Sequence, residues 1–265
     1  MPGTPQAVTH ISFEPAAILF DARPIWNAVN RAAGEGRLPA DAMQRISGPW
    51  GDIAIHLATR DAIMRRAVRE LKEGMKSLCD LIPVTLSLDS LRNLTPLRGD
   101  TAEAARDRVL LAIDSFLYEF RAFLELLAKF CYGVLTELGK QPASTQRLSS
   151  GKRVTLEDKK GNLRPNDFLR YLCDQLQIPV LWYEFLSSHR NFFTHEAAPY
   201  CAVEHRLVSP AEYDLLIMRT IIVNFSTAAP EDYFRLSECS AVLEGIYRLA
   251  GGVQHHLIAT IDDLP

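Results

Sequence analysis

The sequence has few of the short patterns from which an enzyme class is usually recognised. Its five cysteines form no CxxC pair and have no metal-ligand spacing. A dispersed set of this kind is typical of reduced thiols in a cytosolic protein. There is also no HExxH, no Walker loop, no GxGxxG before a helix and no serine nucleophile elbow. We therefore expect a cytoplasmic protein that uses neither a metal nor a cofactor.

Long apolar runs and a strong net charge are missing as well. The most apolar stretch, residues 109–138, is interrupted by charged side chains, so a membrane span would be costly. Residues 1–13 lack the pattern of a signal peptide. Lys and Arg together number 29 against 32 Asp and Glu, which gives a net charge of -3. We expect no membrane partner, and a protein of this charge that binds nucleic acid would need a local basic patch or a few well-placed contacts.

Apolar spacing predicts an all-α protein built as an antiparallel helical bundle with short loops. The longest pattern runs from Asp100 to Gly139 and is typical of a central helix. Residues 140–165 are polar and turn-rich and fit either a hairpin or a mobile loop. Other helices are expected near 15–33, from 39, and over 52–82, 166–176, 180–198, 210–225 and 231–261, the last with a break at 251–252 left open, and a short strand over 201–208.

Residues 83–100, which hold Pro83, Pro96 and Gly99, are typical of a connection between two parts of the chain. Residues 1–50 hold six of the 15 prolines, yet they are too apolar for a disordered tail. We expect residues 1–99 to form an N-terminal helical extension that packs on a main helical domain of residues 100–265.

Two segments are locally basic, and each has two interpretations. The helix over 52–82 is read by default as a solvated face, with a phosphate-backbone track as the alternative. Residues 140–165 are read by default as a solvated loop, with a loop that grips substrate as the alternative. Their basic residues are Arg60, Arg65, Arg66, Arg69, Lys72 and Lys76 in the first, and Arg147, Lys152, Arg153, Lys159, Lys160 and Arg164 in the second.

One run, SSHRNFFTHE at 187–196, combines a phosphate binder with a proton carrier. Arg190 offers a planar fork of donors that suits phosphate, and His195 belongs to the residue type that changes charge near neutral pH. Asn191 and His195 are four apart and share a helix face, whereas Arg190 and His195 are five apart and do so only in part. The pocket therefore needs a second surface to complete it.

This Arg-Asn-x3-His motif, late in an all-helical chain, resembles the HEPN superfamily over residues 100–262. The resemblance implies a homodimer whose motifs converge in a cleft, metal-independent cleavage of RNA, and a role in toxin–antitoxin or phage-defence systems with an antitoxin or sensor partner. In such a site His195 would be the general acid or base. Arg190 would stabilise the charge on phosphorus, and Asn191 would orient His195 or the phosphate.

The resemblance also implies an acidic residue on an earlier helix near Arg190, for which Asp114 and Glu119 are both candidates. Two other interpretations remain open. In the first, the chain is a non-catalytic HEPN-like module that dimerises or binds nucleotide or RNA. In the second, it is a structural scaffold in which His195 caps carbonyl groups near Pro199. Exposure of His195 beside Arg190 in a groove would distinguish them.

Overall fold

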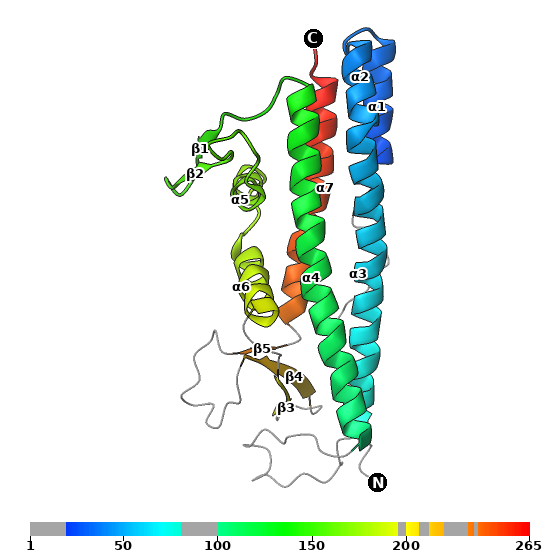
Figure 1. Ribbon diagram of the computed structural model, residues 1–265, viewed down its shortest axis with the longest axis vertical. Coiled ribbons are helices and arrows are strands. Elements are labelled where there is room, and N and C mark those ends of the chain that lie inside the picture. The colour runs from blue at the N-terminus through cyan, green and yellow to red at the C-terminus, as the bar shows by residue number, and fades with distance from the viewer. Residues whose placement is uncertain (1–19, 81–99, 196–199, 207–211, 220–232, 236–237) are drawn as a thin grey trace. The chain divides into compact units, whose positions relative to one another are not determined.

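The computed structural model describes most of the chain, namely residues 20–80, 100–195, 200–206, 212–219, 233–235 and 238–265. Within them lie seven helices and five short strands, so the all-α prediction is confirmed (Figure 1). The helices are α1 (Arg23–Gly34), α2 (Ala40–Ser47), α3 (Pro49–Asp80), α4 (Asp100–Glu137), α5 (Pro165–Gln175), α6 (Leu181–His195) and α7 (Cys239–Asp262).

The strands form two small antiparallel sheets. One is the hairpin of β1 (Thr145–Arg147) and β2 (Arg153–Thr155), so residues 140–165 form a hairpin. The other has the order β3-β4-β5, from strands β3 (Tyr200–Arg206), β4 (Glu212–Met218) and β5 (Tyr233–Arg235).

The chain divides into two compact units, each assembled from separated segments. We call Ala16–Ile63, Glu119–Glu184 and Leu243–Pro265 the bundle unit. The described part of the sheet unit lies in Met64–Tyr118 and Phe185–Val242. The boundary expected at residue 99 falls in 81–99, outside the described residues, and stays a prediction.

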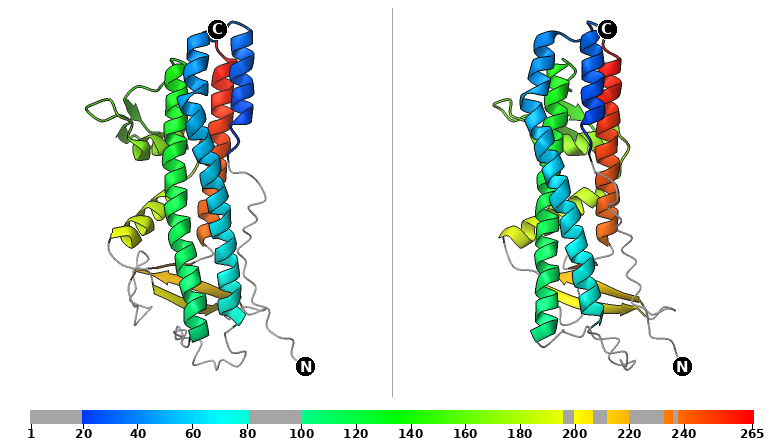
Figure 2. Two further views of the ribbon diagram at one scale, coloured as in Figure 1. Left: turned by 45° about the vertical axis from the view of Figure 1, so that its right-hand side comes forward. Right: turned by 90° about the vertical axis from the view of Figure 1, so that its right-hand side faces the viewer.

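Apolar faces of several helices meet in the core of the bundle unit. The ring of Phe130 on α4 has its centroid 5.5 Å from that of Phe20 and 5.9 Å from that of Trp26 on α1, both in edge-to-face geometry. Ile25 and Phe130 have no exposed surface. In both views of Figure 2, α1 lies alongside the C-terminal part of α7. Burial of these large side chains is the main stabilising contribution to this unit.

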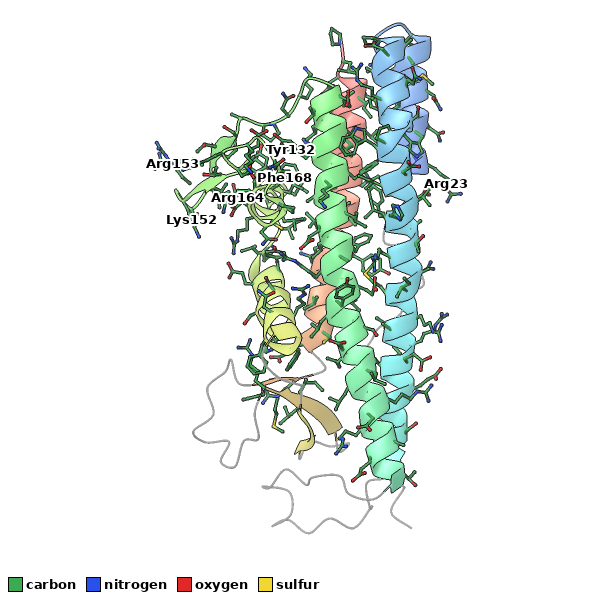
Figure 3. The ribbon with its side chains drawn as sticks, in the orientation of Figure 1. Arg23, Tyr132, Lys152, Arg153, Arg164 and Phe168 are labelled. Atoms are coloured by element: carbon green, nitrogen blue, oxygen red, sulfur yellow. The ribbon has the colours of Figure 1, made fainter. Side chains whose placement is uncertain are left out.

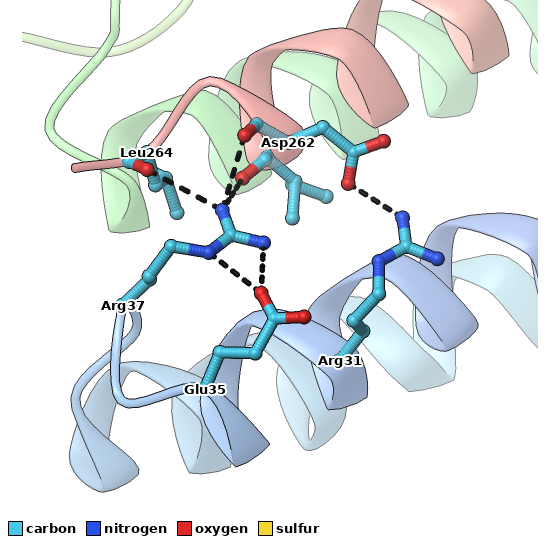
Figure 4. Close-up of polar contacts among 6 residues, drawn as sticks. Arg31, Glu35, Arg37, Asp262 and Leu264 are labelled. Carbon is cyan, nitrogen blue, oxygen red and sulfur yellow. Dashed lines mark hydrogen bonds and ion pairs between the residues drawn. The ribbon is translucent and has the colours of Figure 1, made fainter.

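One arginine closes the C-terminal end of α7. The last carbonyl groups of a helix have no partner within the helix. Arg37 Nη1 donates to the carbonyl oxygens of Ile261 at 2.9 Å and Asp262 at 3.1 Å, while Arg31 pairs with the Asp262 carboxylate at 2.5 Å (Figure 4). The sharp turn after α1 thereby fixes the end of the last helix.

Replacing each of two glycines in helix interiors by alanine is expected to affect the stability of the protein differently. A Cβ at Gly133 would overlap the ring of Trp50, whereas one at Gly251 would meet nothing within 4 Å. Gly251→Ala is expected to stabilise the protein by about 1 kcal/mol through helix propensity. Gly133→Ala has the same gain but must displace a rigid ring, which costs about 1–3 kcal/mol, so it should be neutral to destabilising. Urea unfolding of both variants measures the difference, and equal shifts would contradict it.

The helix expected over 210–225 is wrong. Residues 212–218 form β4, which pairs with β3 along its whole length, from Tyr200 opposite Met218 to Arg206 opposite Glu212. Leu216, Ile217 and Met218 are all buried, as in a central strand covered on both faces. A short apolar run of this kind cannot be told from a buried helix by periodicity alone.

The C-terminal stretch also differs from expectation in its first part. Residues 233–235 form β5, and α7 begins only at Cys239. The helix then continues through Gly251 and Gly252 without a break. A Cβ at Gly252 would lie 2.9 Å from Leu176 Cδ1, so this glycine allows the segment that follows α5 to approach α7 closely.

Candidate functional site

The predicted motif lies at the end of α6, within the sheet unit. His195 is the last residue of the helix, and its side chain lies outside the described part of the structure. Residues 196–199, over which the helix was expected to continue, are also outside it. Whether His195 is exposed beside Arg190, the observation that would distinguish the interpretations, therefore lies outside the described residues.

Arg190 is half-buried and Asn191 is exposed. Arg190 Nη1 donates to Asn191 Oδ1 at 3.3 Å, so the first two motif residues do lie together. Arg190 Nε is buried without a hydrogen-bond partner in the described part of the chain. A guanidinium with unused donors is the group that a phosphate oxygen would satisfy.

Neither expected acid forms an ion pair with Arg190 among the described residues. Asp114 on α4 is exposed and belongs to the same unit as Arg190. Glu119, in the bundle unit, is engaged by Arg60, whose Nη1 lies 2.5 Å from Glu119 Oε2. A carboxylate on Arg190 would compete with a bound phosphate, and none of the described carboxylates pairs with this guanidinium.

A second arginine lies against the same stretch of α6, and sequence reasoning missed it. Arg219 follows β4 directly, and its Nη2 donates to Ser188 Oγ at 2.5 Å. Its guanidinium stacks on the ring of Phe192, 5.0 Å from the centroid. In the described residues it forms no ion pair with a carboxylate. We call Ser188, Arg190, Asn191 and Arg219 the α6 cluster.

His189 lies within this stretch but is poorly suited to transfer protons at neutral pH. It is only 4% exposed and packs near Phe193, with ring centroids 6.2 Å apart. Burial, with a smaller contribution from the charge of Arg219, lowers its pKa to about 4. The imidazole is therefore neutral at pH 7 and a weak base. Proton transfer at this helix end would depend on His195.

A second polar cluster lies within the bundle unit. Arg121 on α4 donates from Nε to Glu125 Oε1 at 2.8 Å and from Nη1 to Tyr183 Oη at 2.5 Å, and it also contacts Asn166 Oδ1. Arg121 is 9% exposed and Tyr183 1%. Because its donors are already used within the fold, this cluster ties α4 to α5 and α6 rather than presenting a binding surface.

The described residues hold neither a metal-binding group nor a membrane-spanning helix. No group of three or more His, Cys, Asp and Glu side chains there is arranged to hold a metal ion. Of the helices described, none is at once long and apolar enough to span a bilayer.

Comparison of the chain with protein-family models, with curated proteins and with solved structures gives no match.

Proposed function

We propose that this protein is a metal-independent RNA endonuclease of the HEPN type. The observation that carries the proposal is the α6 cluster, in which Arg190 lies on α6 and Arg219 contacts the same helix from the end of β4. Neither arginine pairs with a carboxylate among the described residues. The guanidinium of Arg190 beside Asn191 offers donors suited to a phosphodiester, and Arg219 adds a second positive charge against the same stretch of α6. The proton carrier is His195, one helical turn beyond Asn191.

The proposed reaction is an internal transfer at phosphorus. The ribose 2′-oxygen attacks phosphorus as His195 takes the proton of the 2′-hydroxyl, and the bond to the 5′-oxygen breaks as that oxygen takes a proton from water. Protonated His195 then returns its proton to the solvent, which restores the site. The products are a 2′,3′-cyclic phosphate and a 5′-hydroxyl. Arg190, helped by Arg219, stabilises the extra negative charge on the phosphoryl oxygens. The reaction requires RNA, because DNA has no 2′-hydroxyl.

The biological setting belongs to the same proposal. A ribonuclease of this kind acts in the cytoplasm as a homodimer that places two motifs in one cleft. It would serve in toxin–antitoxin or phage-defence systems, restrained by an antitoxin or sensor protein.

One observation favours a second candidate, a non-catalytic module that dimerises or binds RNA or nucleotide. The other histidine of the motif region, His189, is buried and has a pKa of about 4, so His195 would have to perform every proton transfer. A site with two arginines and no working histidine would bind phosphate without cleaving it.

Induced expression in cells distinguishes the two candidates. Wild type, Arg190→Ala and His195→Ala are compared at matched protein levels, with Arg248→Ala as a control, since Arg248 is an exposed arginine paired with Glu244. A nuclease arrests growth and leaves RNA ends with 2′,3′-cyclic phosphate, and both effects disappear in the two motif variants but persist in the control.

Intact RNA and normal growth with the wild type would contradict the nuclease under these conditions. RNA binding that is lost only in Arg190→Ala would then favour the binding module. Cleavage that survives in His195→Ala would place the catalytic residues elsewhere.

A further inference from the structure

The hairpin segment, residues 140–164, concentrates positive charge in a chain whose net charge is -3. It contains seven basic and two acidic side chains in 25 residues. The basic residues are Lys140, Arg147, Lys152, Arg153, Lys159, Lys160 and Arg164. The whole segment is described, so the placement of these charges can be followed residue by residue.

The pairing of β1 with β2 sets two arginines directly opposite each other. The register places Arg147 against Arg153 and Thr145 against Thr155, and all four residues are exposed. Val154, on the other face of β2, is buried. Because side chains alternate along a strand, the hairpin has one buried face and one face of two arginines and two threonines. Like charges directly opposite each other are unfavourable unless an anion lies between them.

The acidic residues around the hairpin are engaged in holding its fold. Glu157 accepts a hydrogen bond from Tyr132 on α4. Asp158 accepts from the side-chain amide of Asn162 at 2.9 Å, and from the backbone N–H of Asn162 at 2.9 Å and of Lys160 at 2.7 Å. Together these hydrogen bonds hold the pKa of Asp158 below the usual range. On α5, Asp174 accepts from Ser149 N at 3.0 Å. These contacts anchor the hairpin without neutralising its outward face.

The basic side chains at the tip are left for an external partner. The side chains of Arg147, Lys152 and Arg153 form no hydrogen bond or ion pair with any described residue, whereas Arg164 pairs with Asp167 at 3.0 Å. Figure 3 shows Lys152 and Arg153 pointing away from α5. A folded hairpin that holds unneutralised guanidinium groups in a fixed arrangement is prepared to bind a polyanion.

We propose that this hairpin binds the phosphodiester backbone of a nucleic acid strand, separately from the α6 cluster and without depending on the proposed nuclease activity. The binding is expected to be independent of nucleotide sequence, because these side chains contact phosphate groups rather than base edges. Arginine forks and threonine hydroxyls are both donors to phosphate oxygens, and nucleic acid interfaces are polar and positively charged.

Other polyanions fit this surface less well. A membrane surface would require apolar side chains that insert between the lipids, and no large apolar residue of 140–164 is exposed. An acidic protein partner would be expected to meet aromatic anchors in the core of the interface, and the segment contains no Phe, Trp or Tyr.

The test measures binding of the full chain to a fluorescent 20-nucleotide 2′-O-methyl RNA by anisotropy at 50 to 200 mM salt. Arg147→Gln/Arg153→Gln is compared with Arg23→Gln/Arg248→Gln, which removes two exposed arginines that pair with Asp21 and Glu244. The hairpin variant is expected to bind about tenfold more weakly at low salt, and its plot of log Kd against log salt should be less steep by roughly 1.4, the contribution of two phosphate contacts. The control should change by less than about twofold.

Stability is measured in parallel. The hairpin variant removes a like-charge pair, so its thermal midpoint should be unchanged or slightly raised, which separates lost binding from lost folding. Equal weakening in both variants would show that only bulk charge matters and would overturn the proposal. So would absent binding by the wild type, or binding of acidic polypeptide or anionic vesicles in preference to RNA and DNA.

The methylated 2′-oxygen cannot attack phosphorus, so this measurement is independent of cleavage. If Arg190→Ala and His195→Ala show that the protein is not a nuclease, hairpin-dependent binding still supports the hairpin proposal. If cleavage is found but Arg147→Gln/Arg153→Gln binds like the wild type, the hairpin proposal fails alone.

Discussion

Replacement of His195 by alanine is expected to slow RNA cleavage by about 10²- to 10⁴-fold, which is the usual contribution of a positioned general acid or base. The measurement is single-turnover cleavage of a defined RNA by the purified protein, with the end groups of the product identified. The expected effect is large because the other histidine on this stretch of α6, His189, is buried and has a pKa of about 4. It cannot take over proton transfer at neutral pH.

His189 provides the matched control six residues earlier on the same helix. His189→Gln should leave the cleavage rate close to that of the wild type, provided that urea unfolding shows the variant to be folded. Imidazole added to His195→Ala should restore part of the lost rate, because a diffusible base can replace the missing one. Loss of activity in both variants to the same extent, without rescue, would mean that the helix matters for folding rather than His195 for chemistry.

The arginines are expected to act differently. Arg190→Lys should cleave RNA as poorly as Arg190→Ala, because a single ammonium group cannot offer the two parallel donors of a guanidinium. Arg219→Ala is expected to weaken cleavage as well, since its guanidinium lies against Ser188 and Phe192 on the same stretch of α6.

The helices could be predicted because the apolar spacing that marks a helix is contained within one continuous segment and repeats over many residues. The pattern from Asp100 to Gly139 corresponds closely to α4, and Pro165 begins α5 as expected. The strand β4 could not be predicted, because its seven residues adopt a strand only by pairing with β3 and β5. Strand pairing is a tertiary interaction, and it overrode the helix-start signal at Pro210.

The candidate site was predictable to the same limited extent. Arg190 and Asn191 are neighbours in the sequence, and their contact follows from the helix alone. The position of Arg219 depends on where β4 ends, so it could not be read while residues 210–225 were expected to be helical. The neutral state of His189 depends on burial, which single-sequence patterns do not reveal. The partner of Glu119 is Arg60, 59 residues earlier on a different helix.

Replacement of Arg121 by alanine is expected to lower the free energy of unfolding by about 2–4 kcal/mol. Arg121 is 9% exposed, donates to Glu125 and Tyr183, and stacks over the Tyr183 ring at 5.3 Å. Truncation removes these contacts together and leaves a cavity where the guanidinium lay. Tyr183 would keep one partner, since its hydroxyl donates to Asn166 Oδ1 at 2.8 Å.

The chain offers a matched comparison in Arg248 on α7. Both arginines pair with a glutamate four residues away on the same helix, but the side chains of Arg248 and Glu244 are 61% and 64% exposed. Exposed pairs of this kind contribute little because water and salt screen them, so Arg248→Ala should change stability by less than about 0.5 kcal/mol. Urea unfolding of both variants measures the contrast.

A double-mutant cycle then assigns the effect. Burial raises the pKa of Tyr183, so its hydroxyl stays protonated near neutral pH and keeps donating to Asn166. Tyr183→Phe removes that donor and the acceptor of Arg121 while keeping the ring. If the polar network rather than simple packing carries the stability, Arg121→Ala and Tyr183→Phe should be non-additive by about 0.5–3 kcal/mol. Additive losses would mean that the two side chains stabilise α4 and α6 independently, through the surface that each one buries.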